Sequence, residues 1–161
     1  MSKTPPKSQA NAADTPPSIS ILAQYIKDLS FESPNPLQAF GTQTEVAPSI
    51  SVNVQAHANK LGNNNFEVIL EFRAEAKREK DVLFVTELTY GGVVSINGVS
   101  EEQAGPLVMI DCPHLLFPFA RNILADVTRD GGFPPLYLSP IDFAGLYNQK
   151  NSEQQAEKAD A

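Results

Sequence analysis

This chain has one cysteine and two histidines that could ligate zinc, and only two of these three residues stand close together in the sequence. Cys112 and His114 flank Pro113, and the second histidine is His57. A zinc site needs about four protein ligands, or three and a water molecule, and no second ligand pair accompanies Cys112 and His114. We therefore interpret these two residues as packing at the start of a helix, near an interface, and we expect no metal and no cofactor.

The sequence gives no positive support for catalysis. A cysteine nucleophile needs a base and an orienting group, and His57 could reach Cys112 only through tertiary structure. The glycine pairs at 91–92 and 131–132 form no phosphate-binding motif. No carboxylate pair lies in an apolar setting that would raise its pKa for acid catalysis. We predict that the protein is not an enzyme.

Charge and composition narrow the class of partner. The 161 residues carry a formal net charge of -7, which argues against nucleic acid because phosphate binding needs clustered Lys and Arg. The acidity suits either simple solubility or a basic protein partner. A single cysteine excludes an intrachain disulfide and fits a reducing compartment. No apolar run approaches the roughly 18 residues of a membrane span, so we expect a cytoplasmic protein without membrane insertion.

The elements that must position any site begin after a polar tail. We expect a disordered N-terminal tail over 1–18, one domain over 19–148 and a polar C-terminal tail over 149–161. Four segments predict strands: 19–31, 50–56, 66–74 and 82–94. The short polar turns between the last three favour antiparallel pairing. Within the fourth strand, Gly91 and Gly92 indicate a bulge or a close backbone approach.

Helices should follow the strands. A turn is possible at 101–105, and a long helix should begin near Pro113 and stop at Gly131, which is free to take a positive φ. Pro118 predicts a kink or a late start. A short last helix is expected from Ile141 to about Gln149. The result is an α+β domain, a four-stranded antiparallel sheet with the long helix and the short C-terminal helix packed on one face.

The long helix is too apolar for a chain that works alone. One stripe at helical spacing is widened by further apolar residues until the first half is apolar nearly all round. A small sheet can cover only one side, so a partner subunit should cover the rest. The stripe is Leu116, Phe119, Ile123 and Val127, and the widening residues are Leu115, Phe117, Ala120 and Leu124.

Strand parity separates two faces of the fourth strand. The more apolar face should meet the long helix, and it carries Phe84, Thr86, Leu88 and Tyr90. Val85 and Glu87 then point outward. Asp28 and Glu32 are an even number of residues apart on the first strand and share a face. If that face is the outer one, they form an acidic patch with Glu87; a scattered solvated face is the alternative.

Three blocks together resemble the SecB family of bacterial protein-export chaperones. They are YIKDLSFESPN at 25–35, FVTELTYGGVVSI at 84–96 and CPHLLFPFAR at 112–121, the last continuing through 132–136 to Pro140 and Phe143. The blocks follow one another across nearly the whole predicted domain, and the third is long and specific. The resemblance implies an ATP-independent holdase that binds unfolded preproteins and passes them to SecA, the motor of the Sec translocon.

The resemblance also implies surfaces. The basic, zinc-binding tail of SecA would meet Asp28, Glu32, Val85 and Glu87. Clients would lie against Leu37 and Phe40 in the loop after the first strand and against Phe143, Leu146 and Tyr147 in the last helix, with ordinary core packing as the alternative for each. A homotetramer, built as a dimer of dimers, would use Thr86, Leu88, Tyr90, Leu116, Phe119 and Ile123.

One departure and two alternatives stay open. Some family members carry a tryptophan in the loop after the first strand; this chain has none, and Thr44 falls near that place, so we expect a shallower groove wall there. A SecB-like chaperone dedicated to one client, such as a toxin–antitoxin pair, is one alternative function. A domain that binds a small ligand in an apolar groove is the other.

Overall fold

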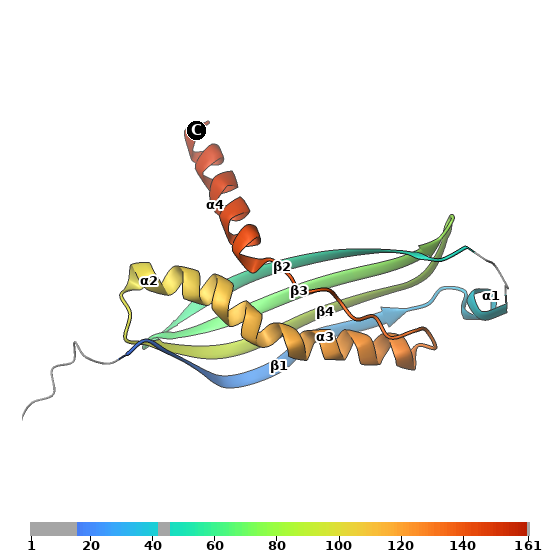
Figure 1. Ribbon diagram of the computed structural model, residues 1–161, viewed down its shortest axis with the longest axis horizontal. Helices are drawn as coiled ribbons and strands as arrows, with labels where there is room; N and C mark the ends of the chain where they lie inside the picture. The colour runs from blue at the N-terminus through green and yellow to red at the C-terminus, as the bar shows by residue number, and fades with distance from the viewer. Residues whose placement is uncertain (1–15, 42–45, 161) are drawn as a thin grey trace, which may run out of the picture.

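A computed structural model of the chain describes residues 16–41 and 46–160 (Figure 1). Most of the predicted N-terminal tail and Thr44 lie outside the described residues.

Four antiparallel strands form one long sheet. They are β1 (Ser18–Glu32), β2 (Ser49–Gly62), β3 (Asn65–Arg78) and β4 (Asp81–Asn97). Their order is β1-β4-β3-β2, so β1 and β2 are the edges. The turns after β2 and β3 place Asn63, Asn64 and Glu79 at positive φ, a conformation that Asn tolerates better than most residues. The predicted α+β class and antiparallel sheet are confirmed.

The connection between β1 and β2 contains a short helix, α1 (Pro36–Gly41). This segment shows no period in the sequence, which predicts a loop that carries Leu37 and Phe40. Ala39 donates its backbone N–H to the carbonyl of Asn35, which closes the first turn. A helix this short has too few apolar positions to show a repeat, which is why the pattern missed it.

One long helical segment crosses a face of the sheet (Figure 1). It consists of α2 (Glu101–Pro106), the π-helical turn η2 (Leu107–Asp111) and α3 (Cys112–Asp130). The turn expected at 101–105 is therefore the start of the long helix, where Ser100 and Gln103 form a reciprocal capping box. Pro118 lies inside α3 without ending it. The irregular turn is η2, which ends two residues before Pro113, a residue that has no N–H for an α-helical bond.

This segment has the length and composition of a membrane span, although the sequence alone indicated no such run. Its apolar stripe has another explanation. Leu116, Ala120 and Leu124 are fully buried in the core beneath α3. The segment therefore reads as the core helix of a sheet protein.

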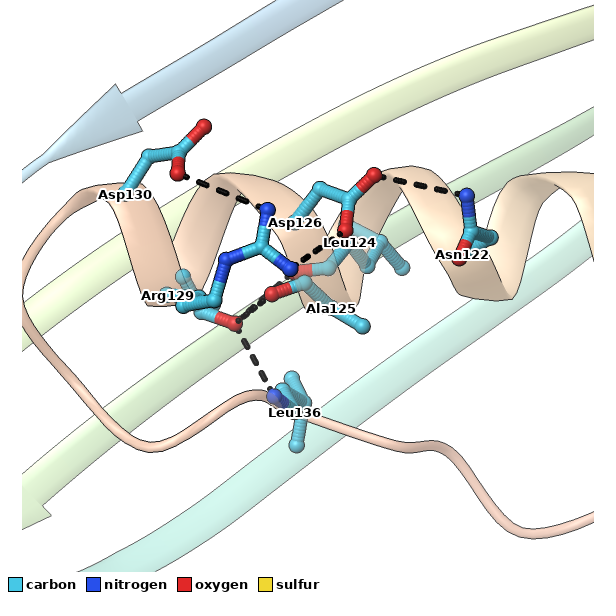
Figure 2. Close-up of polar contacts among 8 residues, drawn as sticks. Asn122, Leu124, Ala125, Asp126, Arg129, Asp130 and Leu136 are labelled. Carbon is cyan, nitrogen blue, oxygen red and sulfur yellow. Dashed lines mark hydrogen bonds and ion pairs between the residues drawn. The ribbon is translucent and has the colours of Figure 1, made fainter.

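The structure corrects the prediction that Gly131 takes a positive φ at the end of α3. Gly131 has a φ of -72° and remains helical, whereas Gly132 takes the positive φ, +92°. Gly131 is needed for space instead: a Cβ there would lie 2.3 Å from Cζ of Phe31. Beyond the glycines the chain turns back along α3. The Thr128 hydroxyl donates to the Leu124 carbonyl at 2.8 Å and accepts the Leu136 N–H at 2.9 Å, and Leu136 lies beside α3 (Figure 2).

The last helix, α4 (Phe143–Ala159), is longer than predicted. It begins at Phe143 instead of Ile141, and it reaches Ala159 instead of ending near Gln149. Asp142 caps it by accepting the Gly145 N–H at 2.9 Å. The residues expected to fray are rich in Gln, Glu, Lys and Ala, which favour helix without an apolar repeat. Among the described residues, α4 packs on η2 and β2 through its first turns, and the helix then projects away from the sheet (Figure 1).

Candidate functional site

The strand register divides the sheet into a helix face and an open face. On β4, Leu88, Tyr90 and Val94 belong to the core together with Leu116 of α3. The residues between them point to the opposite side. A Cβ at Gly92 would lie 2.8 Å from a Leu116 methyl group, whereas one at Gly91 would lie 2.5 Å from the Tyr25 ring. The close backbone approach predicted for this glycine pair is confirmed on both faces.

The open face carries the acidic residues that parity grouped. Asp28 pairs with Thr89, Glu32 with Val85, and Ser30 with Glu87. Asp28, Glu32, Val85 and Glu87 therefore share the face opposite α3, where the three acids are exposed and Val85 is half-buried. A shallow hollow of about 270 Å³ lies on this face between Asp28, Glu87 and Glu71 of β3. We call Asp28, Glu32, Val85 and Glu87 the acidic patch.

A cation also lies on the open face, which the sequence analysis did not consider. Arg73 of β3 stands directly across from Glu87, and its Nη1 lies 2.6 Å from Glu87 Oε1. Its Nη2 lies 3.2 Å from Glu75 Oε2. Period-two alternation placed Arg73 on the polar face of its strand, but only the strand register could show which acid it meets.

A second polar cluster lies farther along the open face. Tyr25 donates its hydroxyl to Glu67 at 2.5 Å, and Lys27 lies 3.4 Å from the same carboxylate. Burial, with the hydrogen bond to Glu67, raises the pKa of Tyr25 to about 12. The same hydrogen bond is the largest cause that lowers the pKa of Glu67. This cluster ties the edge strand β1 to β3 across β4.

Most residues assigned to a tetramer interface lie inside one chain. Thr86, Leu88, Tyr90 and Leu116 are buried between the sheet and α3. Because the chain's own helix covers these four side chains, we expect them to support an interface indirectly, and their assignment to it stays a prediction. Ile123 is half-buried against the same core. Phe119 differs, since it is 50% exposed on the outer side of α3.

Apolar surface remains uncovered around α3 and β1. Leu115 and Phe119 are exposed on the helix, and Ile26 and Leu29 are exposed on the edge strand. Ile26 and Leu29 pair with Tyr90 and Leu88, so they lie on the helix face. The sheet thus covers one side of the apolar helix and leaves another open, as the excess of apolar residues predicted.

The predicted client-binding residues are not gathered at one place. Leu37 and Phe40 are exposed on α1, and the Phe40 ring lies 5.2 Å from that of Phe133. Phe143 is fully buried in the main core, which favours the core-packing alternative for this residue. Leu146 and Tyr147 are half-buried on α4. α1 lies beyond one end of the sheet, well away from α4 (Figure 1).

An apolar strip along β2 lies between these two groups, and the sequence analysis missed it. The strip consists of the helix-face residues Ile50, Val52, Val54, Ala56 and Ala58. We call it the β2 strip. Ile50 and Val52 are 47% and 40% exposed, because α3 packs on β4, β3 and β1. Alternation showed that these residues share a face, but not that the long helix leaves that part of the face open.

Two hollows adjoin the β2 strip. One of about 450 Å³ lies between 53–56 and the α4 residues Leu146, Gln149, Lys150 and Glu153. The other, of about 280 Å³, lies between the end of the strip and the start of the long helix. It is lined mainly by apolar residues, Ala58, Phe66, Ile96, Val99, Ala104 and Val108 among them. The strip and the second hollow together form a discontinuous apolar surface along one edge of the domain, whereas the hollow beside α4 is lined largely by polar side chains.

Cys112 and His114 do not form a shared site. Cys112 is fully buried, and burial raises the pKa of its thiol to about 12, so the thiolate that would bind a metal is disfavoured. His114 is exposed and meets the Phe143 ring edge-on at 5.0 Å. Across residues 16–41 and 46–160, no three His, Cys, Asp or Glu side chains are grouped to hold a metal.

Comparison with known proteins agrees with this geometry. A family model described as preprotein translocase subunit SecB matches residues 12–154. The chain belongs to the SecB family. The protein-export protein SecB of Brucella canis is 55% identical over 150 residues, which cover 92% of this chain and 91% of the relative. That of Brucella ovis is 54% identical with the same coverage. The resemblance inferred from the three sequence blocks is confirmed, and the chain is a protein-export chaperone.

A solved structure supports the SecB architecture. The SecB-like chaperone of Mycobacterium tuberculosis, solved with a peptide from the HigA1 antitoxin, has a TM-score of 0.63. The match covers 76% of this chain and 90% of that one, at 12% identity. At this identity the likeness concerns the fold. The alternative of a chaperone dedicated to an antitoxin fits less well than the export chaperones, which share more than half of their aligned residues with this chain.

Proposed function

We propose that this SecB-family chain is an ATP-independent holdase of the cytoplasm, which holds unfolded preproteins on apolar surface and delivers them to SecA. The observation that carries the proposal is the β2 strip, exposed at Ile50 and Val52 and half-buried over the rest, with the two hollows beside it. Extended, apolar client segments would lie along the strip, between α1 and α4. Leu37, Phe40, Leu146 and Tyr147 would contact clients at its two ends.

Apolar area would supply most of the binding free energy. Burial yields roughly 25 cal/mol per Å², so a contact of about 1,000 Å² gains roughly 25 kcal/mol before costs. Ordering the client removes much of this gain. Because area and not hydrogen-bond readout supplies the energy, selectivity should be loose. Folded proteins, whose apolar segments are buried, should be ignored.

The acidic patch is the proposed docking surface for SecA. It lies on the open face, away from the β2 strip, so clients and SecA could be bound together. Acidic side chains at an exposed surface set the encounter rate and the salt sensitivity for a basic partner more than the final affinity. Val85, half-buried between Glu32 and Glu87, would add apolar contact.

Self-association into a dimer of dimers would cover the apolar surface around α3 and β1. Phe119 and Leu115 would contact the partner directly. Thr86, Leu88, Tyr90 and Leu116 would act indirectly, by fixing α3 on the sheet. Ile123, half-buried at the margin of the core, would support the same interface.

The proposal is tested by light scattering after size exclusion, with a reduced, unfolded preprotein as the client. We expect a particle of about four chains that retains the unfolded client and ignores the same protein once folded. Phe119→Asp should lower the mass of the particle without unfolding the chain, since this side chain is half-exposed. A monomer that is indifferent to unfolded chains would contradict the proposal and direct the search toward a small ligand.

A further inference from the structure

The open face holds one arginine that already occupies part of the acidic patch. Arg73 and Glu87 stand opposite each other in the β3–β4 register, with 2.6 Å between Nη1 and Oε1. The other nitrogen of the guanidinium reaches Glu75 at 3.2 Å. One cation therefore bridges two carboxylates on the face where a basic partner would dock.

The remaining acids of the patch are not masked in this way. Within the part of the chain that the structure describes, Asp28 and Glu32 take part in none of the ion pairs, whereas Glu87 takes part in one. Glu87 is thus the single acid of the patch that a partner would find already paired with a cation.

The ion pair between Arg73 and Glu87 can be separated at little cost in free energy. The side chains of Arg73 and Glu87 are 50% and 48% exposed, and exposed ion pairs contribute only about 0–1 kcal/mol. Glu75 would keep a counter-ion if Arg73 left, because Lys77 lies 3.0 Å away. The hydrogen bond from Lys77 is also the largest cause that lowers the pKa of Glu75. Releasing Arg73 therefore leaves no isolated charge on that side.

We infer that Arg73 is a built-in competitor for the basic segment of the partner: the segment must displace the guanidinium from Glu87 before its own cation can pair there. This inference rests on the proposed docking of SecA at the acidic patch. Arg73 would lower the affinity for SecA and confine binding to segments with enough cations to replace it. Arg73 is then a residue that sets specificity, and not a contact residue.

The test measures the affinity of full-length, zinc-loaded SecA for the intact chaperone by calorimetry, at low and at high salt. Arg73→Gln should tighten binding about two- to five-fold at low salt, the range expected for removing one exposed ion pair. The gain should shrink at high salt, where exposed charges are screened. The gain should also vanish when Glu87 is absent: the Arg73→Gln/Glu87→Gln double variant should bind SecA no more tightly than Glu87→Gln alone, because Arg73 then has no carboxylate to compete for.

Arg129→Gln is the matched control. Arg129 is a half-exposed arginine of α3 that pairs with Asp126 and Asp130 (Figure 2). Its removal changes the net charge equally, away from the open face, and should leave the affinity for SecA near that of the wild type. Binding of an unfolded preprotein by each variant reports that the chain has folded.

The outcomes separate the inference from the function on which it rests. If Glu87→Lys weakens binding of SecA and Arg73→Gln behaves like Arg129→Gln, the competitor role is overturned and the docking surface stands. Weaker binding by Arg73→Gln would also overturn it, since Arg73 would then be a contact residue. If Glu87→Lys leaves the affinity unchanged, the docking surface itself fails, and the inference fails with it.

Discussion

The two faces of the sheet use the same strands in opposite ways. Leu88 is 1% exposed beneath α3, whereas the next residue back, Glu87, has a side chain that is 48% exposed on the open face. Beneath α3 the helix face is closed by apolar packing, whereas the open face carries exposed ion pairs. Stability should therefore depend on the helix face, while the open face can vary its charges for recognition at little cost in stability.

The sharpest test of this comparison uses the two neighbours on β4. Leu88→Ala should lower the free energy of unfolding by about 2–5 kcal/mol, the range for a truncated core leucine. Glu87→Gln should cost less than about 1 kcal/mol, as an exposed ion pair allows. Urea unfolding of both variants measures the difference. Because Leu88 lies in the core of one chain, we expect loss of stability first and any loss of assembly as its consequence. Equal losses for the two variants would contradict the division of the sheet.

The glycine pair offers a second test with a smaller expected effect. Gly92→Ala should cost about 1–3 kcal/mol, as other overpacked cores do, because Leu116 is fully buried and has no room to move. Gly91→Ala should cost less, since it presses on the ring of Tyr25, which is only partly buried on the open face. Thermal unfolding of the two variants checks the order. A larger loss for Gly91→Ala would show that the open face is the more tightly packed one.

The smallest effect is expected at the Tyr25–Glu67 hydrogen bond. A carboxyl whose pKa is lowered in the folded state stabilises the fold at any pH above its unfolded-state pKa. This stabilisation is lost as the pH falls through its folded-state pKa. Tyr25→Phe removes the largest cause of the lowered pKa of Glu67. The variant should therefore lose about 1 kcal/mol or less at neutral pH and approach the wild type in acid.

Urea unfolding across a pH series measures this difference. Tyr137→Phe is the control, because Tyr137 is an exposed tyrosine whose ring faces Arg121 away from the sheet. A deficit for Tyr25→Phe that grows as the solution is acidified would contradict the sign of the coupling.

Much of the acidic patch was accessible from the sequence. The spacing of Asp28 and Glu32 and the alternation around Glu87 are local properties of extended chain, in which successive side chains point to opposite faces. The β2 strip was not accessible in the same way. Ile50 and Val52 alternate as clearly as the residues of β4, yet only the position of α3 leaves them exposed while Leu88 is covered.

In the last helix, too, the sequence pattern does not show which apolar residues are buried. Phe143 and Leu146 are both apolar and stand three residues apart, which groups them on one side of a helix. The path of the segment after Gly132 brings Phe143 into the core and leaves Leu146 at the edge of a hollow. No pattern within α4 records that path, because contacts outside α4 hold the segment, among them the hydrogen bonds from Leu136 to Thr128 and from Arg121 to the Leu138 carbonyl.

The sequence by itself determined the strands and their two faces, the long apolar helix and the need to cover it on more than one side. These follow from periodicity and side-chain chemistry, which act over a few neighbouring residues. Only the tertiary structure decided which apolar side chains are covered and which acid meets a cation. Coverage of Leu88 but not of Ile50 depends on where α3 crosses the sheet, and the pairing of Arg73 with Glu87 depends on the register between two strands.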